Sequence, residues 1–419
     1  MGFQQGLSGL NAASKNLEVI GNNIANANTF GAKVARAEFA DVYANAIGGS
    51  SNAVGIGVTV ASVAQQFTQG NISTTDNPLD IAINGGGFFA VSNPAGAISY
   101  TRNGEFKVDN AGFIVNNQRQ RLMGYPADPT GTIIPGAASA LQMPTGGITP
   151  AVSTRVTMEL NLDSRLAVTL PAAGAPIDFA DPSTYNNATS QTVYDARGQD
   201  VSLTYYFQRA SADTWNVYVA ANGVPIATAG GNPAASTQIV FPPNGGTPTA
   251  PVGTVPLSIP AVTNSAGATT IPIPAVALDV SGATQYGSQF GVTDLAQDGY
   301  ASGQLIGVQF EANGIINARY SNGQTRPAGQ LELATFRNPQ GLQPQGGNGW
   351  TRTVASGDPI VGVPGAGNLG VLQAGALEES NVDLTGELVE MITAQRVYQA
   401  NAQTIKTQDQ ILQTIVNLR

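Results

Sequence analysis

The sequence predicts a mainly β protein of the α+β class, with one helix at each end of the chain and nested β-rich domains between them. Three observations support this prediction. Apolar residues recur at heptad spacing at both termini, short alternating stretches fill the interior, and turn-forming residues are abundant. Fifty glycines and 25 prolines in 419 residues are typical of turn-rich β structure rather than of a helical body.

The C-terminal stretch, residues 383–419, has the pattern of a long amphipathic helix. Asp383 is suited to cap its start, and no proline interrupts it. Burying about eight apolar side chains at ~1.5–3 kcal/mol each hardly offsets the ~1–2 kcal/mol per residue that ordering the helix costs, so the stripe needs several partners. The residues expected in this stripe are Leu384, Leu388, Met391, Tyr398, Ile405, Leu412 and Ile415.

The N-terminal stretch is its expected partner, because it carries the same seven-residue repeat. Two such helices predict a terminal coiled coil that brings the ends of the chain together. The opposite face of each helix is polar but almost uncharged, whereas a solvated helix face usually carries Glu and Lys. An ordinary wet surface remains an alternative explanation for these faces. The N-terminal stripe consists of Phe3, Leu7, Leu10, Leu17 and Ile24.

Composition excludes several classes of function. Only 11% of the residues are charged and the net charge is −9, so no basic patch is available for nucleic acid. The chain has no cysteine and no histidine, which removes disulfides, thiolate chemistry and the commonest general base and metal ligand. No apolar run is long enough for a membrane span, and the N-terminus lacks the features of a cleaved signal peptide.

Along the chain, the signals are arranged symmetrically around a central section. This order predicts four nested parts: a helical coiled-coil domain from 1–30 and 372–419, a linker from 31–70 and 359–371, a β-rich domain from 71–144 and 285–358, and an inserted outer section from 145–284. Much of the central section is rich in Gly, Ala, Pro and Thr, so a flexible linker is an alternative there. Its recurring Val, Ile and Leu favour a β-domain with long loops.

No constellation of residues predicts catalysis, a cofactor or a metal. The run GGGFFA at 85–90 matches a dinucleotide-binding fingerprint, but strand signals rather than a helix follow it, so a turn or bulge is the better interpretation. The carboxylates are scattered. Two of them could meet as a glycosidase pair, although solvated surface is the more economical reading.

Five segments together resemble the bacterial flagellar rod and hook protein family. They are NNIANANTFGAK at 22–33, LDIAINGGGFF at 79–89, YTRNGEF at 100–106, SNVDL at 380–384 and QRVYQAN at 395–401. The resemblance covers roughly the first 125 and last 115 residues, while 145–284 carries no family signature. Length and the insertion are most similar to the hook members, and a distal rod or other axial protein is the alternative.

The resemblance implies a self-assembling subunit of a curved helical tube that couples rod to filament as a universal joint. Gln399, Gln403 and Gln410 would line a central channel for unfolded subunits, because fixed charges there would hold passing chains. Phe39 and Tyr43 fit the family's export pattern, or else form an apolar pair that anchors the linker.

The implied partners are further copies of the chain, the rod, hook-cap and hook–filament junction proteins, and the flagellar type III export apparatus. The implied location is the extracellular hook, reached without a cleaved signal peptide. A secreted carbohydrate-active enzyme and a surface adhesin are the alternatives from other classes.

Overall fold

The computed structural model describes residues 2–42, 55, 57–170 and 176–417, and it divides into two compact units. The terminal unit comprises Met1–Thr145, Gly307–Arg319 and Thr325–Arg419, and the inserted unit comprises Gly146–Ile306 and Tyr320–Gln324. Both are mainly β, and the long helices α1 (Gly2–Ala25) and α2 (Leu384–Asn417) belong to the terminal unit. The predicted fold class, mainly β with a helix at each terminus, is confirmed.

Both helices begin or end at residues suited to that position. Asp383 caps α2, since its Oδ1 accepts a hydrogen bond of 3.0 Å from the backbone N of Thr385. After α1 the chain turns through Gly31, whose φ of 70° lies in the left-handed region. A β-carbon at Gly31 would lie 2.4 Å from the backbone N of Asn103, so only glycine fits there.

The segment predicted as a linker at 31–70 instead contains an antiparallel hairpin. Strands β1 (Ala35–Val42) and β2 (Gly57–Gln65) pair from Ala35↔Gln65 to Val42↔Gly57, with a register shift at Glu38/Phe39. The hairpin packs against α1, to which it is hydrogen-bonded. Helix α1 is therefore covered on one side by its own chain.

The rest of the terminal unit is an antiparallel β-domain that the first and last parts of the chain build together. Its aromatic core contains Phe88, Tyr100, Phe336 and Trp350, and the Phe88 and Trp350 rings meet edge to face with centroids 5.8 Å apart. The main path of its largest sheet runs β23-β24-β25-β9-β5-β6-β28-β27 among the described residues.

The other elements of the terminal unit have the following bounds: β3 (Ile72–Thr74), β4 (Ile81–Asn84), β5 (Phe88–Ser92), β6 (Ile98–Thr101), β7 (Lys107–Val108), β8 (Ile114–Val115), β9 (Arg121–Pro126), β10 (Ser139–Ala140), β23 (Leu305–Phe310), β24 (Ile315–Tyr320), β25 (Thr325–Leu331), β26 (Leu333–Thr335), the 3-10 helix η2 (Pro339–Gly341), β27 (Gln343–Gly346), β28 (Gly349–Thr351), β29 (Ile360–Gly362), β30 (Val371–Ala374) and β31 (Ala376–Glu378). Strands β23 and β24 each reach into the inserted unit at one end.

The inserted unit has a hydrophobic core of its own between two sheets. One sheet is ordered β19-β20-β11-β21 with β22 on β11, and the other β12-β13-β14-β15 with β18 on β14. Fully buried Met158, Tyr205 and Trp215 contribute to the shared core. The indole N–H of Trp215 donates to Gln285 Oε1 at 2.8 Å.

The bounds of the inserted unit differ from the predicted 145–284. The unit continues to Ile306, because β21 and β22 both pair with β11. Its elements are β11 (Arg155–Asp163), the 3-10 helix η1 (Pro182–Thr184), β12 (Asn187–Tyr194), β13 (Asp200–Arg209), β14 (Thr214–Ala221), β15 (Val224–Pro225), β16 (Thr228–Ala229), β17 (Asn232–Pro233), β18 (Thr237–Val240), β19 (Val255–Ile259), β20 (Ile273–Asp279), β21 (Thr284–Tyr286) and β22 (Gly291–Gln297).

Candidate assembly site

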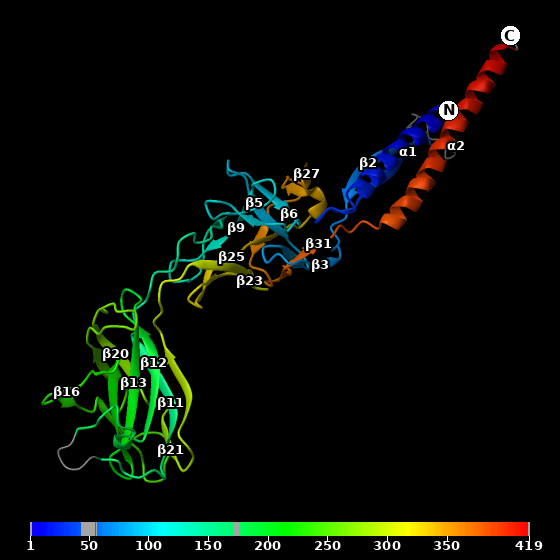
Figure 1. The fold of residues 1–419 in the computed structure, drawn as a ribbon. Coiled ribbons are helices and arrows are strands. Elements are labelled where there is room, and N and C mark those ends of the chain that lie inside the picture. Colours follow the sequence, from blue (N-terminus) through cyan, green and yellow to red (C-terminus); the bar gives the residue numbers. More distant parts are fainter. Residues whose placement is uncertain (1, 43–54, 56, 171–175, 418–419) are drawn as a thin grey trace. The chain divides into compact units, whose positions relative to one another are not determined.

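Helices α1 and α2 lie side by side and run antiparallel (Figure 1). Two glycines of α1 lie at their contact. A β-carbon at Gly6 would lie 3.0 Å from Ile405 Cγ1, and one at Gly9 would lie 2.7 Å from Asn401 Oδ1. The two glycines therefore let the helix backbones approach closely. The contact face of α1 is a row of small residues, in contrast to the large heptad residues that the sequence pattern favours for it.

Most of the predicted stripe residues remain accessible in the single subunit. Six keep between 37% and 50% of their surface exposed: Phe3, Leu7, Leu384, Leu388, Tyr398 and Leu412. Five are half-buried: Leu10, Leu17, Ile24, Met391 and Ile405. Ile415 lies in α2, but its side chain is outside the described part of the structure. A heptad repeat drifts by ~20° per seven residues around a straight helix, so one narrow partner cannot cover such a stripe.

The C-terminal end of α2 extends beyond α1, as Figure 1 shows. Gly6 packs beside Ile405, so α1, which begins at Gly2, is too short to reach the last turns of α2. Ile411 and Leu412 lie in those turns and are about half exposed. The last turns of α2 thus present half-exposed apolar side chains beyond the reach of α1.

The three glutamines predicted to line a channel share one face of α2. Their spacing of four and seven residues keeps Gln399, Gln403 and Gln410 within a narrow sector at 3.6 residues per turn, and all three are exposed. The same geometry places this sector on the side of α2 opposite Asn401 and Ile405, which face α1. The three glutamines therefore lie on a side of α2 directed away from its partner helix, with the exposed side chains of Arg396 and Lys406 three or four residues from them on the same side.

The polar face of α1 has a different role from the one its composition suggests. Gln5 Nε2 donates to Gly55 O at 2.7 Å, and the Val58 backbone N donates to Ser8 Oγ at 3.3 Å. The buried Asn23 amide exchanges two hydrogen bonds with the backbone of Ala35, of 2.8 and 2.9 Å. These polar residues hold the β1–β2 hairpin on the helix.

The two predicted export residues fall at the hairpin, and only one is described. Phe39 lies in β1 with 42% of its surface exposed, and Tyr43 lies outside the described residues. The Phe39 ring borders an open apolar groove of about 600 Å³ between α1, α2 and the hairpin. Ala12, Ala13 and Val397 also line this groove.

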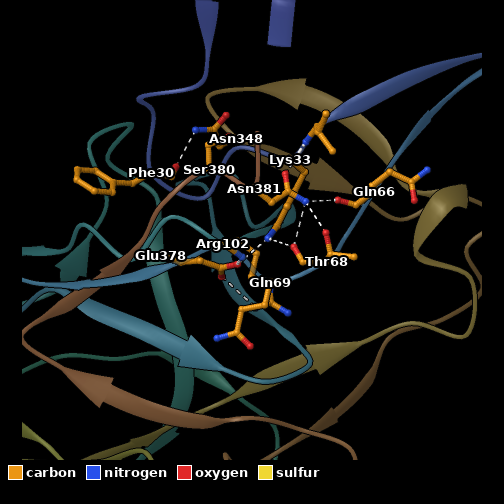
Figure 2. A network of polar contacts seen from close by, with 12 residues as sticks. Phe30, Lys33, Gln66, Thr68, Gln69, Arg102, Asn348, Glu378, Ser380 and Asn381 are labelled. Atoms are coloured by element: carbon orange, nitrogen blue, oxygen red, sulfur yellow. Dashed lines mark hydrogen bonds and ion pairs between the residues drawn. The ribbon is translucent and has the colours of Figure 1, made fainter. Parts of the chain in front are cut away.

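Both connections between the helices and the β-domain pass through one polar network (Figure 2). Asn381 is one of its centres: its Oδ1 accepts from the Val34 backbone N at 2.7 Å, and its Nδ2 donates to Gln66 O at 2.9 Å and Thr68 Oγ1 at 2.8 Å. A buried cluster of Lys33, Glu378 and Arg102 is the other.

Sequence reasoning missed the charged members of this network as a site. Lys33 and Glu378 are 345 residues apart and Arg102 and Glu378 are 276 apart, so no local spacing links them. The available signal was the position of Lys33 and Arg102 inside the recognised segments at 22–33 and 100–106, in a chain with few charges.

The described residues contain no group of acidic side chains arranged to hold a metal ion. Within the same residues, no helix is both long enough and apolar enough to cross a membrane.

Four family models match successive parts of the chain. They are Flagella basal body rod protein at residues 3–33, Flagellar hook protein FlgE/F/G D1 domain at 82–159, Flagellar basal body protein FlaE D2 domain at 161–300, and Flagellar basal body rod FlgEFG protein C-terminal at 373–418. The chain is thus of the flagellar rod and hook class.

Full-length relatives narrow the class to one family. The chain is 42% identical over 424 residues to the flagellar hook protein FlgE of Salmonella typhimurium and 40% identical to that of Escherichia coli, with 100% of each chain covered. It is 32% identical to the FlgE of Borreliella burgdorferi, over 99% of this chain and 98% of that one. The chain belongs to the flagellar hook protein family, whose members are structural subunits of the hook.

A solved structure supports the same fold. The Helicobacter pylori flagellar hook protein FlgE2 aligns over 73% of this chain and 100% of its own, with a TM-score of 0.51 and 15% sequence identity.

Proposed function

We propose that this hook subunit assembles through its terminal helices into a curved tube that acts as a universal joint between rod and filament. The observation that carries the proposal is the exposure of large apolar residues on α1 and α2. Phe3, Leu388 and Leu412 are each 46–50% exposed in the subunit, and large apolar side chains exposed along both helices offer a surface for other protein segments. Neighbouring copies of the same helices would cover it.

In such a tube the glutamine face of α2 is suited to a central channel. Gln399, Gln403 and Gln410 project away from α1, and they offer hydrogen bonds without a fixed charge. A chain passing through the channel would meet these neutral amides beside the cations Arg396 and Lys406. This arrangement places α2 inside the tube and the hairpin on α1 further out.

The inserted unit is suited to the outer part of the tube. A rotating curved tube must continuously shorten and lengthen its subunit spacing, and closely packed apolar contacts resist such sliding. The large apolar residues of this unit, such as Met158, Tyr205 and Trp215, are enclosed in its own core. Its sequence is rich in small and polar residues, which would slide more readily, although Leu170, Val252 and Ile306 are exposed at its surface.

The proposal extends to partners and location. The rod, hook-cap and hook–filament junction proteins would bind the ends of the tube, and the type III export apparatus would deliver the chain to an extracellular position without a cleaved signal peptide. Phe39 and Tyr43 remain candidates for the export signal. The protein would act through assembly alone, without catalysis.

Electron microscopy of the concentrated full chain tests the proposal, with tubes as the expected result. A second sample lacking the inserted unit tests the bending role. Gly147 and Gly303 offer a suitable junction for this deletion. Ile148 N donates to Gly303 O at 2.8 Å, so the segment that enters the inserted unit and the segment that leaves it lie side by side there.

Replacing residues 147–304 by a short glycine linker should give straight tubes, because the outer contacts that set curvature are gone. Curved tubes from this deletion would show that the inserted unit does not set the curvature. A full chain that stays monomeric under all conditions, with its helices folded, would contradict assembly through the terminal helices.

A further inference from the structure

One carboxylate joins the three parts of the terminal unit. Glu378, the last residue of β31, accepts a 2.6 Å hydrogen bond from Lys33 Nζ at Oε1 and a 3.0 Å hydrogen bond from Arg102 Nη1 at Oε2 (Figure 2). Its Oε1 also accepts from the Gly70 backbone N at 2.9 Å. The Glu378 and Lys33 side chains are fully buried, and Arg102 is 4% exposed.

The three residues occupy the points where the chain passes between the helices and the β-domain. Lys33 lies just before β1 on the way from α1, and Glu378 lies six residues before α2. Arg102 directly follows β6 and belongs to the β-domain itself. The backbone repeats the connection, because Gly31 N donates to Glu378 O at 2.8 Å. We name residues 31–34 the N-terminal crossing and residues 378–381 the C-terminal crossing.

The anion meets both cations only when both crossings are in place. Two cations share one anion, and each cation has a second acceptor: Lys33 Nζ donates to Thr68 O at 2.7 Å and Arg102 Nη2 to Gly85 O at 2.9 Å. Burial lowers the pKa of both Lys33 and Arg102, and the Glu378 carboxylate opposes that shift in each. If the C-terminal crossing leaves, two cations remain in a water-poor site without their anion.

Neutral hydrogen bonds also connect the two crossings. Asn381, a member of the C-terminal crossing, bonds to Val34 of the N-terminal crossing and to Thr68 with uncharged groups alone. Buried ion clusters are seldom more stabilising than apolar packing, so their best-attested use is to favour one arrangement over its alternatives. Because Glu378 pairs with two cations, a state in which only one crossing is docked on the β-domain leaves unpaired charges buried. A state in which both crossings are undocked costs less free energy, since water then reaches all three groups.

We infer that Glu378 is a positioning residue that makes the two crossings dock on the β-domain as one cooperative unit, so that α1 and α2 leave it as a fixed pair. Lys33 and Arg102 precede Glu378 in the chain by hundreds of residues. The N-terminal crossing therefore cannot close stably until the C-terminal end of the same chain is present. The pairing of α1 with α2 therefore requires that both crossings of the chain are present.

Amide-resolved hydrogen exchange of the full chain tests this coupling and does not depend on assembly. The reporters are Val34 N for the N-terminal crossing, Glu379 N for the C-terminal crossing and Leu141 N for the β-domain, each of which has a hydrogen-bond acceptor in the structure. Glu378→Gln keeps the shape but turns an N–H donor toward a cation. We expect exchange at Val34 and Glu379 to accelerate together by roughly tenfold or more, with Leu141 unchanged.

Glu379→Gln is the matched control, because this neighbouring carboxylate is bonded at 3.2 Å to Asn71 at the surface and touches neither cation. It should leave the Val34 exchange rate unchanged. Acceleration at Glu379 alone in Glu378→Gln would show that the crossings open independently. Equal acceleration at Leu141 would show that Glu378 serves general stability. Either result overturns the inference.

A second variant separates charge from packing. Lys33→Met leaves a one-to-one pair of Glu378 and Arg102, so it should fold and still accelerate exchange at both crossings. Adding Glu378→Gln to Lys33→Met then leaves one buried cation, Arg102, without its anion, instead of two. The extra acceleration should therefore be smaller than in the parent background. Strictly additive effects would indicate packing alone and would contradict the inference.

Discussion

Leu412→Asp should leave the subunit folded and unable to assemble. Leu412 is 50% exposed and lies in the part of α2 that α1 is too short to reach, so a carboxylate there stays hydrated in the free subunit. In a tube, a neighbouring copy would have to cover that carboxylate without a counter-charge, which costs several kcal/mol at every subunit contact. Since each 1.4 kcal/mol is a factor of ten, we expect the concentration needed for assembly to rise by roughly a hundredfold or more.

Sedimentation of the parent and variant chains over a range of concentrations measures this threshold. Gln403→Glu is the matched control, because it adds the same charge at nearly the same size on the opposite face of α2. It should assemble near the parent threshold if that face lines a water-filled channel. If Leu412→Asp formed ordinary tubes, the last turns of α2 would not be part of the assembly surface.

Gly104→Ala should unfold the β-domain of the terminal unit and spare the inserted unit. A β-carbon at position 104 would lie 1.6 Å from the carbonyl oxygen of Ile81, a fully buried residue whose backbone N donates to Gly104 O at 3.1 Å. The clash is with backbone, so no side-chain rotation relieves it. We expect a loss of more than about 3 kcal/mol from the free energy of unfolding of this domain.

The two tryptophans of the chain allow the units to be followed separately. Trp350 is buried in the β-domain and Trp215 in the inserted unit. In denaturant, Gly104→Ala should shift the emission change of Trp350 to a much lower concentration and leave that of Trp215 in place. Gly136→Ala, where the β-carbon meets no atom within 4 Å, should change neither. An unchanged Trp350 transition in Gly104→Ala would contradict the packing described here.

The sequence was informative wherever structure follows a local period. The heptad spacing predicted both terminal helices, and the strand signals at residues 79–83 and 88–91 correspond to β4 and β5. The Gly-rich run at 85–87 forms the turn between them, with positive φ at Gly85 and Gly87 and no helix after it. These features depend on near neighbours in the chain.

Features set by distant contacts were not predictable in the same way. The segment that forms the hairpin β1–β2 was assigned to a linker, because the local sequence does not show that its two strands pair and pack on α1. The inserted unit was expected to end at 284, since nothing local shows that β22 pairs with β11 more than 130 residues earlier. The Glu378 cluster has no sequence period at all, and only the fold brings its members together.

The choice of contact face between the helices has a specific physical cause. A heptad count favours the largest apolar residues, but Gly6 and Gly9 allow a closer backbone approach than any leucine seam. The large residues are then left around that narrow contact. The exposed stripe is consistent with a helix pair that has further partners in the tube.

The central claim is that the apolar side of α2 is covered on assembly while its glutamine face stays wet. The chain has no cysteine, so a single introduced thiol reports on one position. The decisive measurement is the rate at which a small maleimide reacts with Leu412→Cys and with Gln403→Cys, in free subunits and in assembled tubes. We predict that assembly slows the reaction at position 412 by roughly tenfold or more and leaves position 403 nearly as reactive as before. Equal rates at position 412 in both states, or protection of position 403 alone, would contradict the account.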